Sequence, residues 1–146
     1  MKKTIWIKAL AVALTAVLGF SLAGCSGGLS ESEVSYAGPA LDNVLAGIKD
    51  KDLSEFSKDF DDTMKNIYTQ EVFDDFVSLL QTKIGDYVSK TFGAAAPATE
   101  NNVTYTKVIY KAKYTNETSD VLVTIVFDGQ QKVTGLFFSS PNLAKQ

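Results

Sequence analysis

Histidine and arginine are absent from this sequence, and cysteine occurs only once. Without histidine the chain lacks the commonest metal ligand and a common general base, which excludes most catalytic triads and Cys/His metal clusters. Without arginine it lacks the planar guanidinium that binds phosphate or carboxylate in bidentate fashion. A single thiol cannot form an internal disulfide, so packing must stabilise the fold.

Positive charge is scarce in most of the chain. The 14 basic residues are all lysines, against 17 acidic residues. Residues 25–146 contain 11 of these lysines and all 17 acidic residues, a formal charge of −6. Because contacts to nucleic-acid phosphates need clustered positive charge, we expect no nucleic-acid partner.

The N-terminal part has the three regions of a secretory signal peptide. Lys2, Lys3 and Lys8 form a basic region, an apolar run over residues 9–20 follows, and small residues come next. The run is followed by the motif Leu22, Ala23, Gly24 and Cys25. This motif resembles the lipobox of bacterial and archaeal lipoproteins, in which cleavage precedes the cysteine and the thiol carries a diacylglycerol. We therefore expect residues 1–24 to be a signal peptide and Cys25 to be lipidated.

An uncleaved transmembrane helix is the alternative interpretation of the same run. Residues 9–24 number only 16, whereas about 20 residues are needed to cross a hydrocarbon core of about 30 Å. Cleavage is therefore favoured, and two acyl chains on Cys25 would anchor the protein stably. The expected location is extracytoplasmic, on a cell membrane, with the diacylglycerol as the membrane contact.

The remainder divides into three parts. Residues 26–38 are small and polar without periodicity, so residues 25–38 are expected to be the lipidated cysteine with a flexible tether of about 20 Å. Residues 39–140 form a single domain of ordinary size. Residues 141–146 are expected to be a frayed tail.

Three helices are predicted at the start of the domain. Pro39 marks the first helical position of the first helix. Its apolar stripe is Leu41, Val44, Leu45 and Ile48. Asp52 is the expected cap of the second helix, along which apolar residues recur at helical spacing. These are Leu53, Phe56, Phe60 and Met64. The third helix spans about residues 70–83, with Thr69 as its cap and Gly85 as the left-handed residue that ends it.

After Gly85 the periodicity changes to that of strands. Residues 87–92 predict a short strand and residues 93–102 a loop. Residues 103–114 predict a half-buried antiparallel strand, because apolar residues alternate with lysines. The inward residues are Val108, Tyr110, Ala112 and Tyr114. Residues 121–127 form the next strand.

The last strand is predicted over residues 132–138. A tight two-residue hairpin turn at Asp128-Gly129 would connect it to the strand before, because glycine readily adopts positive φ. Gly135 inside this strand indicates a bulge or a close backbone approach. The fold class is therefore α+β, with about three helices packed on a curved antiparallel meander of three to four strands.

Several segments resemble the domain-of-unknown-function 3887 (DUF3887) family. They are residues 50–56 (DKDLSEF), the helix end at residues 79–85, and above all Phe127-Asp128 leading to residues 132–138 (KVTGLFF). The resemblance covers about residues 39–140. It implies a cone like that of the nuclear-transport-factor-2-like or cystatin-like proteins and a place on lipoproteins, and it brings no established catalytic residues.

Acidic and basic clusters offer few candidates for chemistry. The densest acidic stretch contains Asp59, Asp61 and Asp62, preceded by Asp50, Asp52 and Glu55. A calcium loop counted from Asp50 would need glycine at its sixth position, which is Glu55, so a solvated helix face is favoured and no metal is expected. Surface charge is likewise the favoured interpretation of Asp74-Asp75.

Three lysines, Lys107, Lys111 and Lys113, form a basic stripe along one strand face. This stripe could meet an acidic partner or lipid headgroups. Protection of an exposed sheet face against aggregation is the simpler role.

Two functions remain open. The favoured one is a non-catalytic, lipid-anchored module that binds a small apolar ligand, a polymer or an envelope protein through the concave sheet face, without a cofactor. The alternative is a small proton-transfer enzyme, of the isomerase or hydrolase type, that uses an aspartate with a tyrosine. The candidate tyrosines are Tyr87, Tyr105, Tyr110 and Tyr114. The enzyme hypothesis predicts an enclosed polar cavity that holds a carboxyl group with a raised pKa.

Overall fold

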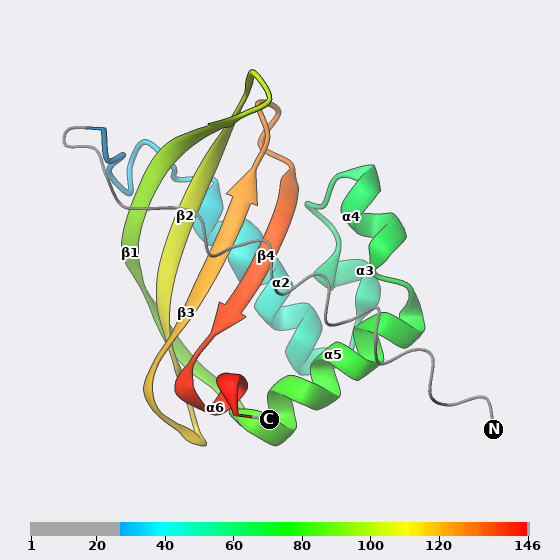
Figure 1. Ribbon diagram of the computed structural model, residues 1–146. Helices are drawn as coiled ribbons and strands as arrows, with labels where there is room; N and C mark the ends of the chain where they lie inside the picture. The colour runs from blue at the N-terminus through cyan, green and yellow to red at the C-terminus, as the bar shows by residue number, and fades with distance from the viewer. Residues whose placement is uncertain (1–26, 146) are drawn as a thin grey trace.

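The structure, a computed structural model, describes residues 27–145, in which helices pack against one face of a curved sheet (Figure 1). The predicted signal peptide, its motif from Leu22 to Gly24, and Cys25 lie outside the described residues. None of the helices within residues 27–145 combines the length and the apolar character needed to cross a membrane.

The helices of the described part are α2 (Ala37–Asp50), α3 (Leu53–Phe56), α4 (Asp62–Ile67), α5 (Gln70–Lys83) and α6 (Pro141–Ala144). Helix α5 confirms the predicted third helix, and the Thr69 hydroxyl accepts the Val72 N–H at 3.4 Å. Gly85 follows α5 with a φ of 79°, the left-handed conformation that was predicted. The Asp52 carboxylate accepts the Ser54 N–H at 2.9 Å and so caps α3, also as predicted.

The strands are β1 (Tyr87–Glu100), β2 (Val103–Tyr114), β3 (Glu117–Phe127) and β4 (Val133–Ser139). They pair antiparallel in the order β1-β2-β3-β4, which leaves β1 and β4 as the edge strands. The α+β fold class, with helices first and an antiparallel meander afterwards, is thereby confirmed.

A hydrophobic core fills the space between the helices and the inner face of the sheet. Helix α2 contributes the predicted stripe, and β2 and β3 contribute every second side chain because strand side chains alternate between faces. The largest fully buried residues are Phe56, Phe60, Phe73, Phe127, Leu41, Leu80, Ile84 and Ile125.

Strand β1 is much longer than predicted. The loop expected over residues 93–102 is wrong, because β1 pairs with β2 as far as Glu100. Asn101 and Asn102 form the turn, with φ values of 50° and 64°, as a primed hairpin turn requires. Pro97 is tolerated because β1 is an edge strand, where one row of backbone groups needs no partner.

The predicted second helix is wrong as a single element, because contacts with β4 divide it. Phe60 lies between α3 and α4 and forms an isolated parallel bridge with Val133. Val133 donates its N–H to the Asp59 carbonyl at 2.9 Å and accepts the Asp61 N–H at 3.0 Å. The Asp61 carboxylate then starts α4 by accepting the Met64 N–H at 2.7 Å.

The turn between β3 and β4 also differs from the prediction. A two-residue turn at Asp128-Gly129 is wrong: the loop spans residues 128–132, and its left-handed residue is Gln131 with a φ of 61°. The Asp128 carboxylate accepts the N–H groups of Gln130 and Lys132, both at 2.8 Å. An aspartate side chain that bonds to the following backbone therefore shapes this turn.

Gly135 lies beside a bulge, one of the two alternatives predicted for it, and its close neighbours are side chains. A β-carbon at this position would lie 3.2 Å from the Phe137 ring and 3.3 Å from the Val126 side chain. The pairing register of β3 and β4 also shifts between Val126 and Phe127, so a bulge lies beside this glycine.

The flexible tether predicted before the domain is wrong for its described part. Leu29 donates its N–H to the Ala95 carbonyl of β1 at 2.7 Å and extends the sheet by one bridge. Val34 is only 1% exposed, and α2 begins at Ala37, two residues before Pro39. Leu29 and Val34 are isolated apolar residues in a polar stretch, and they contact parts of the domain that are distant in the sequence.

The predicted frayed tail instead contains helix α6. Asn142 donates its backbone N–H to the Glu117 carboxylate at 2.9 Å, and the Ser140 hydroxyl accepts the Leu143 N–H at 3.3 Å. Lys83 at the end of α5 donates to the Lys145 carbonyl at 2.7 Å. The contacts of Asn142 with Glu117 and of Lys83 with Lys145 join residues far apart in the sequence, so local patterns did not predict them.

Candidate functional site

The candidate site is the seam between helix α2 and edge strand β1. Near its middle, Lys90 of β1 forms an ion pair with Asp42 of α2. The Lys90 side chain is only 15% exposed, because β1 directs it toward the inner face, opposite Ala112 of β2. The ion pair separates two hollows, here called the upper hollow, beside Tyr110, and the lower hollow, beside Tyr114.

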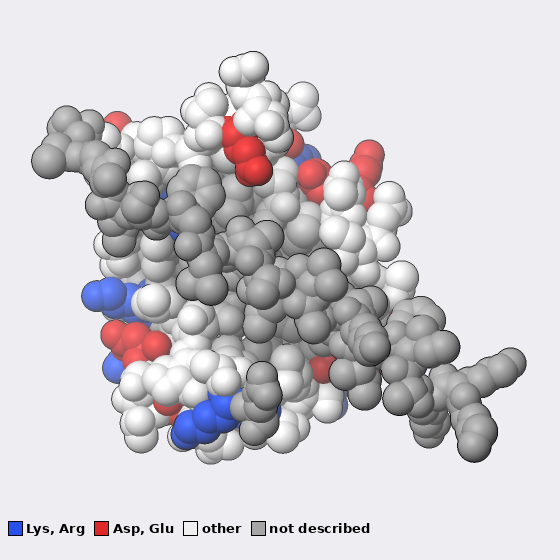
Figure 2. Space-filling model, viewed as in Figure 1, with Lys and Arg blue, Asp and Glu red and all other residues white. Residues whose placement is uncertain are grey.

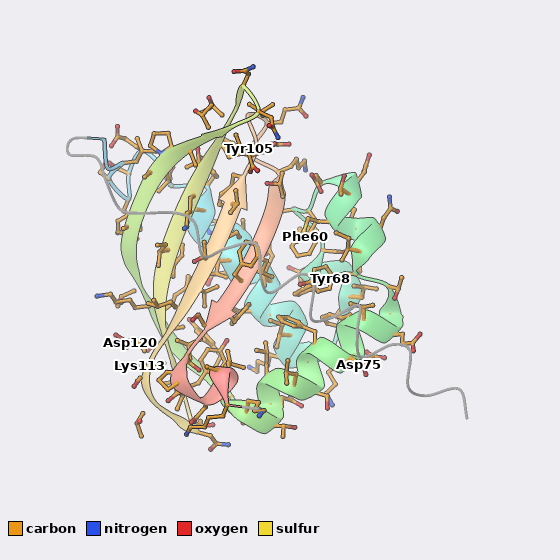
Figure 3. The ribbon with its side chains drawn as sticks, in the orientation of Figure 1. Phe60, Tyr68, Asp75, Tyr105, Lys113 and Asp120 are labelled. Carbon is orange, nitrogen blue, oxygen red and sulfur yellow. The ribbon has the colours of Figure 1, made fainter. Side chains whose placement is uncertain are left out.

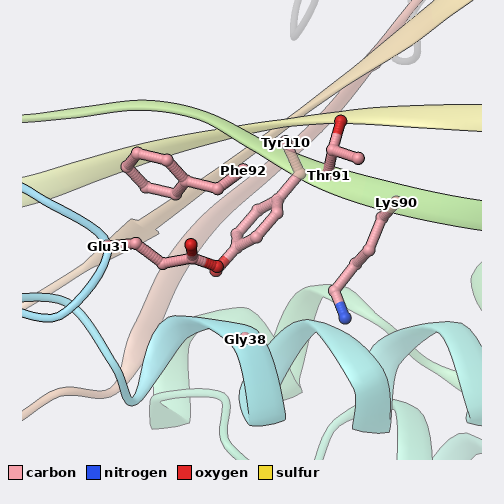
Figure 4. Close-up of a pocket in the computed structure, with 6 residues that line it drawn as sticks. All are labelled: Glu31, Gly38, Lys90, Thr91, Phe92 and Tyr110. Atoms are coloured by element: carbon pink, nitrogen blue, oxygen red, sulfur yellow. The ribbon is translucent and has the colours of Figure 1, made fainter.

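The upper hollow is an open groove of about 470 Å³ (Figure 4). Its lining residues are Glu31, Gly38, Lys90, Thr91, Phe92 and Tyr110. The Phe92 and Tyr110 rings meet edge to face with their centroids 6.0 Å apart, and the Lys90 ammonium lies 5.8 Å from the Tyr110 ring centroid. The groove therefore combines an aromatic wall with one cation.

The Tyr110 hydroxyl lies in an anionic environment. The Glu31 carboxylate points toward this hydroxyl (Figure 4). Asp42 lies at the ion pair with Lys90. Burial raises the pKa of Tyr110, and the charges of Glu31 and Asp42 raise it further. The phenol is therefore protonated at neutral pH and can donate a hydrogen bond into the groove.

The lower hollow has a volume of about 300 Å³ and lies between the C-terminal ends of α2 and α5 and the start of β1. Its lining residues are Leu45, Ile48, Lys49, Leu80, Gln81, Gly85, Asp86, Tyr87 and Tyr114. Tyr114 is 5% exposed, and its hydroxyl has no hydrogen-bond partner among the described residues. Burial strongly raises the pKa of this phenol, and the neighbouring Tyr87 raises it further.

Three of the acidic residues considered for calcium have structural roles. Asp52 and Asp61 cap helices, and Asp59 accepts a hydrogen bond from the Asn43 side chain at 2.7 Å. Within residues 27–145 no three acidic side chains gather as a metal site would require. Asp74 and Asp75 are both exposed on α5, where Figure 3 shows Asp75 on the side away from the sheet.

The predicted lysine stripe lies on the outer face of β2, where the charges of Lys111 and Lys113 both act on Asp120 of β3. Lys113 pairs with Asp120 of β3 at 2.7 Å (Figure 3). Basic and acidic side chains also lie intermixed at the lower left of the surface in Figure 2. Tyr105 lies toward the opposite end of the sheet, so the structure brings together Tyr87 and Tyr114 but not Tyr105.

The concave sheet face expected to hold a ligand is covered by helices. Its side chains form the core with α2 and α5, which leaves the seam at its border as the hollowed region. The carboxyl groups of Glu33, Glu117 and Asp120 have lowered pKa values, because hydrogen-bond donors stabilise their charged forms. These shifts run opposite to the one that the proton-transfer hypothesis requires.

Sequence reasoning identified Tyr110, Tyr114 and Tyr87 as candidates but missed Glu31, Asp42 and Lys90 as parts of the seam. Glu31 lies in a segment interpreted as a tether, and Lys90 lies in a strand without clear alternation. The inward position of Lys90 follows from its pairing with Ala112 of β2. This register could not be read from the sequence, because it depends on how β1 and β2 pair.

The architecture defines this class of protein: an α+β domain with helices on the inner face of a four-stranded antiparallel meander. An NMR structure of a protein from Ruminococcus gnavus ATCC 29149 shares this fold with a TM-score of 0.52 and 16% sequence identity. The match covers 75% of this chain and 90% of that one.

The family is shown by sequence. The family model described as protein of unknown function (DUF3887) matches residues 42–136, more than half of the chain. The chain therefore belongs to the DUF3887 family. No curated protein matches it. The matched residues include Asp42, Lys90, Tyr110 and Tyr114 of the seam, whereas Glu31 lies before them.

Proposed function

We propose that this protein is a lipoprotein, anchored outside the cytoplasm through a diacylglycerol on Cys25, that presents its DUF3887 domain as a non-catalytic binding module. The observation that carries the anchoring is the motif from Leu22 to Cys25 behind a basic and apolar N-terminal stretch. The domain itself would be a cone of the nuclear-transport-factor-2-like or cystatin-like kind.

The position of Leu29 supports a domain held close to the membrane. Leu29 is bonded to β1 and lies four residues after Cys25. Four extended residues span at most about 14 Å. A lipid on Cys25 would therefore keep the β1 edge of the domain near the headgroups, where an apolar ligand, a polymer or an envelope protein could reach the seam.

The mixed chemistry of the seam supports binding. Aromatic and aliphatic walls provide contact area, and a few polar groups can orient a ligand, as is typical of small-molecule sites. A proton-transfer enzyme is the second candidate, favoured by one observation, the Glu31 carboxylate directed at the Tyr110 hydroxyl (Figure 4). Turnover of a substrate that Tyr110→Phe abolishes would establish that alternative.

Cys25→Ser tests the anchor. Cells fed an alkyne-tagged fatty acid should label the unaltered protein and fail to label Cys25→Ser, because the thiol is the acceptor. Ser26→Ala is the matched control and should be labelled normally. The thermal midpoint of unfolding should be unchanged, since Cys25 lies well before residues 42–136, which the family model matches. Equal labelling of Cys25→Ser, or a bare thiol on the unaltered protein by mass spectrometry, would contradict the proposal.

A further inference from the structure

The Tyr114 hydroxyl is the starting point, because it is buried without a partner. Tyr114 is 5% exposed, and no described residue accepts or donates a hydrogen bond at its oxygen. Buried polar groups are nearly always paired, since an unpaired one costs free energy. Phenylalanine would fill the same space without this cost, so the hydroxyl is unexplained by packing.

The Tyr114 side chain lines the lower hollow, whose other walls are those of a small-molecule site. Leu45 and Ile48 of α2 and Leu80 of α5 give the lower hollow apolar walls, and Tyr87 lies beside Tyr114 with ring centroids 5.9 Å apart. The volume of about 300 Å³ is about twice that of an engineered apolar cavity that binds benzene. A ring with a short substituent would fit there.

Charge at the rim restricts the ligand further. Lys49 and Asp86, both exposed, border the hollow together with the neutral Gln81. One positive and one negative group offer no net attraction to an ion, so an uncharged molecule is favoured. The raised pKa of Tyr114 keeps its phenol protonated, so the O–H can donate a hydrogen bond to an acceptor oxygen on the ligand.

We propose that the lower hollow binds an uncharged amphipathic molecule, an aryl or branched alkyl carbonyl compound, whose oxygen accepts a hydrogen bond from Tyr114. The inference rests on the proposed binding function and names the ligand class and the residue that orients it. Because the Tyr114 hydroxyl oxygen has almost no exposed surface in the ligand-free structure, ligand entry must displace a wall of the hollow to bring the acceptor oxygen to it. The apolar body then lies between α2 and α5.

Two probes of the same shape test the hydrogen bond. Acetophenone carries the carbonyl oxygen, and α-methylstyrene replaces that oxygen by a methylene group. Binding to the full chain in lipid nanodiscs is measured by saturation-transfer NMR, with empty nanodiscs as the blank. Acetophenone should bind the unaltered protein more tightly than α-methylstyrene by about three- to tenfold, the contribution of one neutral hydrogen bond.

Tyr114→Phe should remove this preference and leave α-methylstyrene binding unchanged. The same variant should raise the thermal midpoint of the ligand-free protein, because it removes an unpaired buried hydroxyl. Tyr68→Phe is the matched control, since Tyr68 lies in the aromatic cluster around Phe56, outside the hollow, and should keep the preference. A second variant, Gln81→Trp, should block both probes by filling the mouth.

Three results would overturn the proposal: no acetophenone binding to the unaltered protein, equal acetophenone affinity in Tyr114→Phe, or a lowered midpoint in that variant. Failure of the anchor gives a different result. A chain that does not enter nanodiscs but retains the carbonyl preference in solution would refute lipidation alone.

Discussion

The two sides of helix α2 are built in opposite ways. On one side, Gly47 lets α2 approach α3 so closely that a β-carbon there would lie 2.3 Å from the Phe56 backbone nitrogen. On the other side, α2 meets strand β1 across two hollows and the Asp42–Lys90 ion pair. The difference indicates that α2 is packed more tightly on its α3 side than on its β1 side.

Aromatic packing strengthens the α3 side. The Phe56 ring contacts the rings of Phe60, Tyr68 and Phe73 with centroids 4.7–5.0 Å apart. Such pairs contribute beyond the area that they bury, by about 0.5–1.5 kcal/mol each. No comparable cluster lines the seam, where the described ring pairs are Phe92–Tyr110 and Tyr87–Tyr114 at 6.0 and 5.9 Å.

The largest difference in stability is expected between alanine substitutions at two glycines of α2, Gly47 and Gly38. Gly47→Ala should lower the free energy of unfolding by about 3 kcal/mol, because the new methyl group meets the α3 backbone, which cannot move aside cheaply. Gly38→Ala should be neutral or stabilising by up to about 1 kcal/mol, because its nearest neighbour, the Tyr110 hydroxyl, would lie at an ordinary 3.6 Å.

Urea unfolding followed by circular dichroism gives both values. Equal losses of stability for Gly47→Ala and Gly38→Ala would show that the two sides of α2 are packed alike, and the comparison would fail.

A smaller effect is expected at the ion pair of the seam. Asp42→Asn should cost at most about 1 kcal/mol, because the Asp42 side chain is 60% exposed and solvent screens its charge. Asp120→Asn removes the more exposed pair with Lys113 and should cost less than Asp42→Asn. Thermal unfolding at low and high salt measures both, and the Asp42→Asn effect should shrink as salt is added.

A loss well above 1 kcal/mol in Asp42→Asn would mean that this ion pair holds the seam closed. The β1 side of α2 would then be as firmly packed as the α3 side.

The smallest effect concerns pH and lies away from α2, where Glu117 holds α6. The pKa of Glu117 is lowered mainly by the hydrogen bond from the Asn142 N–H and further by the hydrogen bond from the Ser140 hydroxyl. A carboxyl group with a lowered folded pKa contributes stability above its unfolded value of about 4.3, and this contribution is lost as pH falls through the folded value. Glu117→Gln should therefore reduce stability at about pH 7 and leave it nearly unchanged at about pH 3.

Unfolding midpoints of the unaltered protein and the variant across this range provide the measurement. Asp75→Asn, which alters an exposed carboxylate on α5, is a control for general charge effects. A difference between Glu117→Gln and the unaltered protein that does not depend on pH would contradict this account of Glu117.

Local signals predicted the elements whose causes are local. Helix α5 has a cap at Thr69, an apolar stripe and a left-handed Gly85, all within 17 consecutive residues, and its bounds were predicted correctly. Strand β1 has no such signals beyond residue 92. It is a strand because β2 offers a row of backbone groups to pair with, and pairing is a property of two segments.

The candidate site shows the same division. Tyr110 and Tyr114 were recognised as inward residues because strand alternation is readable in sequence. The sequence did not predict that the Tyr114 hydroxyl lacks a hydrogen-bond partner. That property depends on which atoms of α2, α5 and β1 come within hydrogen-bond distance.

By itself the sequence determined the α+β class, the inward rows of the strands, the helix caps and the exclusion of histidine and arginine chemistry, because these follow from residue types and short spacings. Only the tertiary structure decided the length of β1, the division of the second helix at Phe60 and the seam with its two hollows. These features arise where segments distant in the chain compete for the same backbone hydrogen bonds and the same buried volume, and no local pattern records the outcome.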